Sequence, residues 1–201
     1  DTTVTVAGTG WHHVAYRIDD ATHRSYVYID GVQQGTASYT GSPAYTLGSD
    51  TYIGKHGNGS TGVEFNGRID ELRFSAAFRS PDWIKTEYQT QATAAQGAPA
   101  SPSTVDSTKF IKQKGWQARY FQYRRSITID KGMVVGTHTD FPVLVRVTLD
   151  PAHVKNANGY DTMFTDSSGA ALPHEIESYN SGTGELWAWV KVPTLTSLSD
   201  T

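Results

Sequence analysis

Several residue types that often mark a function are scarce in or missing from this chain. It contains no cysteine, which excludes a disulfide framework, a zinc–thiolate site and a cysteine nucleophile. No apolar run approaches the roughly 18 residues of a spanning helix, so we expect no membrane insertion. Charged residues make up only 18% of the chain, with a formal net charge of -3, whereas nucleic-acid-binding domains are usually basic. We therefore expect no nucleic-acid partner.

Aromatic residues are plentiful instead. The 201 residues include five tryptophans, eleven tyrosines and seven phenylalanines, which is unlike the composition of a disordered chain. Turn-forming clusters separate short runs rich in Val, Ile, Thr and Tyr about every 8 to 12 residues, as in a β-sandwich or barrel. The clearest hairpin joins Ser25–Ile29 to Val32–Gln34, because Asp30-Gly31 supplies the two positive-φ residues of a type I′ turn.

One helix is expected to interrupt the strands. Ser80 is a favourable N-cap and Pro81 suits the first helical position, while Asp82 complements the helix dipole. Helical spacing then places Trp83, Ile84 and Tyr88 on one buried stripe.

A stretch with linker composition divides the chain. Residues 91–108 are rich in Ala, Ser, Thr and Pro and show no apolar periodicity. We therefore expect two all-β units, at 1–90 and 116–201, joined by a linker at 91–115. Further strands are expected at 11–18, 51–54 and 67–74 in the first unit, and at 126–129, 141–147, 162–165, 172–177 and 186–192 in the second.

The motifs of both units carry a family resemblance. The first unit combines WHHVA, YIDG, GRIDE and RSPDWI. It resembles the C-terminal half of a laminin-G-like jelly roll of the concanavalin A-like lectin/glucanase superfamily. The second unit, with YRRSITID, TDFPVLVRV and WAWVKVP, resembles a bacterial β domain of unknown function that commonly accompanies such jelly rolls. The resemblance implies an all-β fold: an antiparallel β-sandwich with one short helix, followed by a second sandwich-like unit.

Compared with that pattern, both units are expected to be incomplete. The first would lack its N-terminal strands and the second its last strand. Open strand edges and an uncovered core face are liabilities in a free monomer. We therefore expect the two units to pack directly on one another, or another chain to complete them through a homo-oligomer or exchanged strands.

Enzyme activity is not expected. Glucanases of the superfamily carry a Glu-x-Asp-x-x-Glu signature, and glycoside hydrolysis needs two suitably spaced carboxylates. The chain has no such run. Asp70 and Glu71 are adjacent and would point to opposite faces of a strand. Glu175 and Glu177 would share a face, but as a solvated surface without a third partner.

Asp70 is the candidate metal ligand. On a strand at 67–74 it would point toward the core together with Leu72 and Phe74. A buried carboxylate needs hydrogen-bond donors or a cation. The resemblance implies a structural Ca²⁺ near the last strand, held partly by an Asp and by backbone carbonyls. The alternative is that Asp70 accepts backbone N–H groups and caps a loop.

Tyr26 and Tyr28 are the candidate sugar-binding residues. They would share the face of their strand opposite Val27 and Ile29, and exposed tyrosines can stack on sugar rings and donate hydrogen bonds. Cross-strand packing within the sandwich is the alternative. Trp187 and Trp189 share a face and are interpreted as core residues.

Together these features predict a non-catalytic module for carbohydrate binding or cell adhesion. It would belong to a larger secreted or surface protein, with a polysaccharide or glycan as its partner. A purely structural repeat that mediates chain–chain contacts is the main alternative. A third possibility is an accessory part of a glycoside hydrolase.

Overall fold

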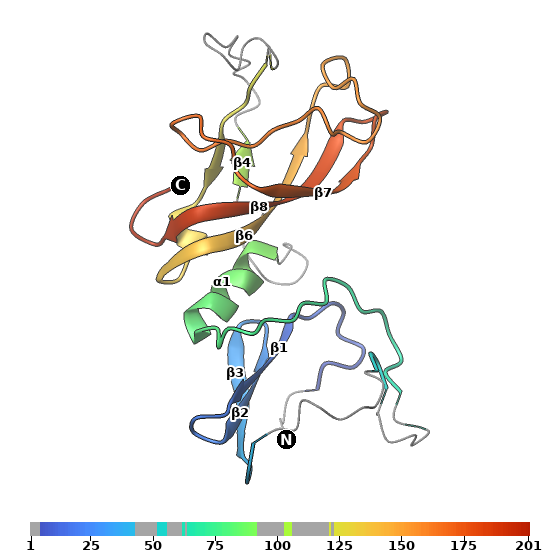
Figure 1. Cartoon of the computed structure of the whole chain (residues 1–201). Helices are drawn as coiled ribbons and strands as arrows, with labels where there is room; N and C mark the ends of the chain where they lie inside the picture. Colours follow the sequence, from blue (N-terminus) through green and yellow to red (C-terminus); the bar gives the residue numbers. More distant parts are fainter. Residues whose placement is uncertain are drawn as a thin grey trace.

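The computed structural model describes residues 5–42, 52–55, 62, 64–91, 103–105, 121 and 123–201. These residues form a three-stranded sheet, one α-helix and a larger group of strands, in that order along the chain (Figure 1). The elements are β1 (Val14–Asp19), β2 (Arg24–Ile29), β3 (Val32–Ser38), α1 (Pro81–Gln91), β4 (Ser103–Val105), β5 (Ile127–Ile129), a 3-10 turn (Lys131–Met133), β6 (Thr137–Thr148), β7 (His174–Tyr179) and β8 (Glu185–Thr196).

The first sheet has the strand order β1-β2-β3, and both of its pairings are antiparallel. The expected hairpin joins β2 to β3, with positive φ at both Asp30 and Gly31. Asp30 also fixes the segment that leads into β1. Its carboxylate accepts one hydrogen bond from the His13 backbone N–H at 3.0 Å, and its other oxygen lies 2.7 Å from His12 Nδ1. The Asp-Gly signal is confirmed.

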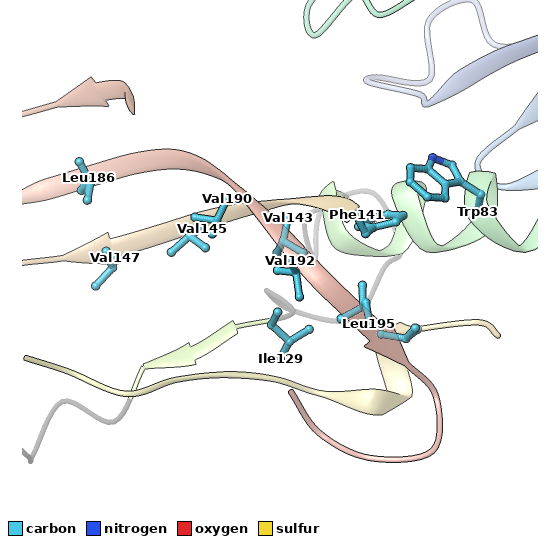
Figure 2. Close-up of a cluster of buried hydrophobic side chains, with 11 residues drawn as sticks. Trp83, Ile129, Phe141, Val143, Val145, Val147, Leu186, Val190, Val192 and Leu195 are labelled. Atoms are coloured by element: carbon cyan, nitrogen blue, oxygen red, sulfur yellow. The ribbon is translucent and has the colours of Figure 1, made fainter. Parts of the chain in front are cut away.

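The second sheet has the antiparallel order β6-β8-β7, and the short pair β4–β5 lies over one of its faces (Figure 2). That inner face is the main core of the molecule. Alternate residues of β6 and β8 point into it, because side chains of a strand alternate between its faces. The buried alternating residues are Phe141, Val143, Val145, Val147, Leu186, Ala188, Val190 and Val192, and Leu195 near the end of β8 and Ile129 of β5 complete the core.

Helix α1 lies between the two sheets (Figure 1). It begins as expected, with the Ser80 hydroxyl accepting a hydrogen bond from the Trp83 N–H at 3.1 Å. Trp83, however, packs into the core of the second unit, with its ring centroid 4.6 Å from that of Phe141. On the other side, a Cβ at Gly31 would lie 3.1 Å from Tyr88. The helix therefore contacts the β2–β3 turn and the second core at once.

The all-β fold class, with antiparallel sheets and one α-helix among the described elements, is confirmed. Some strand positions were wrong. Residues 67–74 contain no strand, and neither do residues 52–55 or 162–165, apart from an isolated bridge between Thr165 and Ala171. Within the expected linker, Ser103–Val105 forms β4 and pairs with β5. The rest of residues 92–115 lies outside the described residues.

No helix in the described parts of the chain is both long enough and apolar enough to cross a membrane.

Candidate functional site

Two tryptophans stand side by side on the outer face of the second sheet. Because Leu186, Ala188 and Val190 of β8 fill the core, Trp187 and Trp189 must project from the opposite face. Both are partly exposed. Their interpretation as core residues was therefore wrong. The spacing of alternate residues on a strand places them about 7 Å apart along β8.

The neighbouring strands surround these indoles with polar groups. Arg146 of β6 lies opposite Trp187, with its guanidinium 4.8 Å from the indole ring. It is held there by Glu185, at 2.6 Å. On β7, Glu175 lies opposite Trp189, and the Glu177 carboxylate accepts a hydrogen bond from the Trp189 indole N–H at 3.0 Å.

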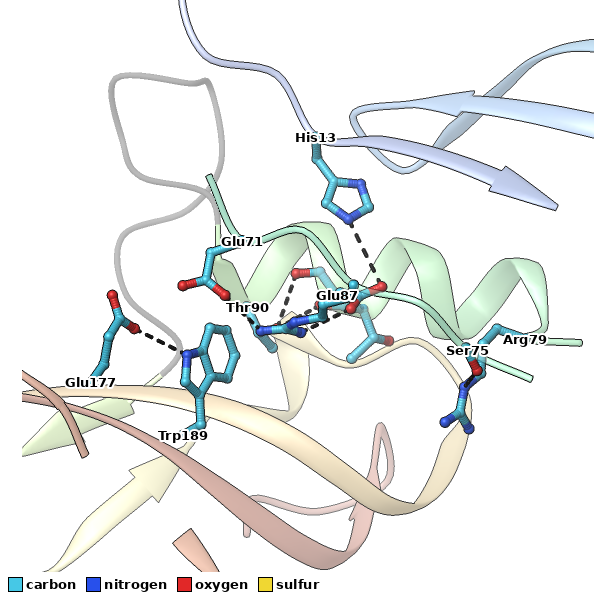
Figure 3. A network of polar contacts seen from close by, with 10 residues as sticks. His13, Glu71, Ser75, Arg79, Glu87, Thr90, Glu177 and Trp189 are labelled. Carbon is cyan, nitrogen blue, oxygen red and sulfur yellow. Dashed lines mark hydrogen bonds and ion pairs between the residues drawn. The ribbon is translucent and has the colours of Figure 1, made fainter. Parts of the chain in front are cut away.

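The first unit reaches this face through Arg73. Its guanidinium lies 3.9 Å from the ring of Trp189. Two carboxylates hold it, one from Glu71 at 3.2 Å and one from Glu87 of α1 at 2.9 Å (Figure 3). The segment before α1, the helix and the second sheet therefore meet in one polar network.

The same network extends to the first sheet through His13. Its Nε2 lies 3.9 Å from the Glu87 carboxylate (Figure 3). The ring centroid of His13 lies 6.2 Å from that of Tyr88. Burial lowers the pKa of His13, although the charges of Glu87 and Asp30 act in the opposite direction. The imidazole is therefore mostly neutral near pH 7.

Glu177 has the opposite perturbation. Burial raises the pKa of its carboxyl, and the negative charges of the nearby Glu71 and Asp70 raise it further, while the hydrogen bond from Trp189 lowers it. Like charges that approach one another favour a protonated carboxyl. The charge of Glu71, on the segment before α1, therefore acts on Glu177 of β7 in the second sheet.

Of the two tyrosines predicted to bind sugar, only Tyr26 is partly exposed. Tyr28 is 2% exposed, and its hydroxyl accepts a hydrogen bond from Arg17 at 2.7 Å and donates one to Gln33 at 3.2 Å. The expectation of an exposed Tyr28 was wrong, because the guanidinium of Arg17 lies over the Tyr28 ring at 5.7 Å and itself stacks on Phe78 at 3.9 Å. Tyr26 remains partly exposed beside the same guanidinium.

Asp70 also lies elsewhere than expected. It is exposed, as are Leu72 and Phe74 at 50% and 82%. Its carboxylate accepts a hydrogen bond from the neighbouring Glu71 N–H at 3.0 Å. The core-facing position was wrong, since residues 67–74 form no strand. The described side chains include no group of three or more His, Cys, Asp or Glu residues close enough to hold a metal ion. A Ca²⁺ at Asp70 stays a prediction.

Sequence reasoning missed the tryptophan face and its partner Arg73. The alternation of LWAWVKV shows that Trp187 and Trp189 share a face, but not which face is covered. A usable signal was present, since between residues 186 and 192 the other face of β8 is composed wholly of Leu, Ala and Val. Nothing in the sequence indicates that Arg73 lies over Trp189.

Comparison with known proteins gives one family and one solved structure. Residues 1–85 match the model of a family described as the concanavalin A-like lectin/glucanases superfamily. This match supports a jelly-roll domain of lectin/glucanase type in that part of the chain. A crystal structure of an S-layer domain-containing protein (residues 221–444) from Clostridium thermocellum is 28% identical, with a TM-score of 0.37.

That likeness covers 43% of this chain and 43% of the S-layer protein chain, so the chain spans less than half of the structure it matches. A TM-score this low places no constraint on the fold. No curated protein matches.

Proposed function

We propose that this chain is a non-catalytic, glycan-binding module of a secreted or surface protein. The tryptophan face, defined as Trp187, Trp189, Arg146, Glu175 and Glu177, is its binding site. The match of residues 1–85 to a superfamily of lectins and glucanases supports a carbohydrate-related role.

The observation that carries the proposal is the pair of partly exposed indoles on one sheet face. Aromatic rings provide apolar contact area for the faces of sugar rings. Arg146 and Glu185 are fixed by their ion pair beside Trp187, so polar groups are already oriented next to an apolar surface. This combination of apolar area and a few placed polar groups is typical of ligand sites. Two indoles in line suit an oligosaccharide better than a single sugar.

Binding of soluble β-glucan, xylan, arabinan and N-acetylglucosamine oligomers, measured by calorimetry, tests the proposal. We expect one class to bind, and we expect Trp187→Ala to weaken that binding at least tenfold. The matched control is Trp11→Ala, which removes an indole that is 48% exposed outside the tryptophan face. Equal effects of the two substitutions, or no binding by the wild-type protein, would contradict the proposal.

A second candidate function is contact between two copies of the chain through the first sheet. One face of that sheet exposes Val14, Tyr16 and Val32 at 61%, 63% and 56%. A shallow groove beside them is lined by the uncharged residues Tyr16, Ser25, Val27, Gly35, Thr36 and Ala37. Two such faces can oppose each other without burying a charge, and a two-fold axis makes one patch serve both chains.

Sedimentation of the wild-type protein and of Tyr16→Glu tests this contact. We expect a dimer that Tyr16→Glu converts to a monomer, because a carboxylate would be buried against the opposite copy. The control Tyr160→Glu changes a tyrosine that is 70% exposed in the second unit and should leave the dimer intact. A wild-type protein that is still monomeric at about 100 µM would refute the contact.

A further inference from the structure

We propose that Arg73 is a built-in cap on Trp189, which a bound glycan must displace. This inference rests on the proposed function, because it concerns access to the same face. The guanidinium lies 3.9 Å from the indole ring centroid. It therefore occupies one of the two ring surfaces on which a sugar would stack, whereas Arg146 lies farther from Trp187, at 4.8 Å.

Ion pairs orient the guanidinium of Arg73 over the indole. It is bound by the carboxylates of Glu71 and Glu87, at 3.2 and 2.9 Å. A planar guanidinium held by two carboxylates keeps its flat face free to stack on an aromatic ring. The indole N–H is held in turn by Glu177 at 3.0 Å. Cap and ring are thus each oriented by their own carboxylates.

Residues 69–74, which carry Arg73, are exposed, and the firmer contacts of the segment lie farther along, where Phe78 stacks on Arg17 and Arg79 stacks on Trp83, both at 3.9 Å. Residues 64–80 contain neither helix nor strand. The apolar neighbours Ile69, Leu72 and Phe74 are exposed at 49%, 50% and 82%, so they contribute little packing that would keep the segment in place. Exposed ion pairs and cation–π contacts are individually weak. A ligand that gains more by stacking on Trp189 can therefore displace Arg73 without unfolding either sheet.

The cap also makes glycan binding and the contact between the two units mutually exclusive at Trp189. The apparent affinity of the site equals the affinity of the uncovered site multiplied by the fraction of molecules in which Trp189 is uncovered. Coupling of this kind is reciprocal, so a bound glycan weakens the attachment of the 64–80 segment to the same extent.

The first arm of the test needs no glycan. N-Bromosuccinimide oxidises accessible indoles, and mass spectrometry of peptides locates the product. In the wild-type protein we expect Trp187 to react faster than Trp189. Arg73→Ala should raise the rate at Trp189 severalfold and leave Trp187 unchanged. The control Arg68→Ala removes an exposed cation five residues upstream and should change neither rate.

The second arm measures binding of cellohexaose and xylohexaose. Loss of the cap should tighten binding roughly threefold to tenfold in Arg73→Ala, as expected for the loss of one cation–π contact and its weak ion pairs. Arg73→Lys retains the charge but stacks less well. It should give an intermediate value and serves as the second variant should Arg73→Ala fail to fold.

The outcomes separate the cap from the proposed function. Unchanged oxidation of Trp189 in both Arg73 variants would refute the cap, whatever binds. Faster oxidation with unchanged glycan affinity would show that Arg73 covers the ring but does not compete, which also refutes it. Faster oxidation, with no variant binding either hexaose or any other oligosaccharide of the panel used for the proposed function, would establish the covering contact and overturn the proposed function instead.

Discussion

The contribution of Trp83 to the second unit can be tested by Trp83→Ala. This side chain comes from α1 yet belongs to the core of the second unit, where it is 9% exposed. It contacts Phe141 at 4.6 Å and His138 at 5.4 Å between ring centroids, and the guanidinium of Arg79 lies 3.9 Å from its ring centroid. The substitution removes the one indole of this core cluster and leaves a cavity next to β6.

Substitutions of this kind destabilise a protein by about 3–5 kcal/mol. In a chain of this length, each kcal/mol lowers the melting temperature by about 2–4 °C. We therefore expect a fall of about 6–20 °C. Hydrogen exchange should show lost protection in residues 141–147 of β6 as well as in α1, because the cavity lies between them.

Trp11→Ala is the control, since surface substitutions usually change stability by less than about 0.5 kcal/mol. Equal melting temperatures for Trp83→Ala and Trp11→Ala would refute the bridging role of α1. Unchanged exchange in β6, with loss confined to the first unit, would do the same.

Three further predictions concern acid, catalysis and calcium. Burial lowers the pKa of His138 more than its hydrogen bond with Val135 and the charge of Asp82 raise it, so the folded state binds the proton less well than the unfolded state. Stability should therefore be lost as the pH falls below the ordinary His value of 6.5. Melting temperatures measured over a series of pH values should depend less on pH in His138→Gln than in the wild-type protein. The purified protein should not hydrolyse β-glucan, xylan or arabinan above a blank, and turnover that disappears in Glu177→Gln would contradict this. If Asp70 binds Ca²⁺, chelator should lower the melting temperature and Asp70→Ala should abolish the difference; identical melting with and without chelator rules the ion out.

Local signals predicted the elements whose stability is local. The Asp30-Gly31 turn and the Ser80 N-cap depend on backbone geometry within a few residues, and both are confirmed. The alternation of β6 and β8 also correctly predicts which residues share a face. Such periodicity is a property of the strand itself.

The candidate site depended on information that alternation does not contain. Tyr28 and Trp189 each lie on a strand with two apolar or aromatic faces, and the covered face is decided by distant partners. Arg17, itself stacked on Phe78, lies over Tyr28, while β4 and β5 lie over the face of β8 opposite Trp189. Similarly, residues 67–74 alternate like a strand, but the structure provides them with no pairing partner.

The central claim is that a glycan binds the tryptophan face, and the indole N–H signals report on it residue by residue. In a nitrogen-15 spectrum titrated with oligosaccharide, the Nε1–H signals of Trp187 and Trp189 should shift together and saturate. The signal of the buried Trp83 should stay in place. Saturable shifts confined to Trp11, or no shift with any oligosaccharide of the panel, would contradict the account.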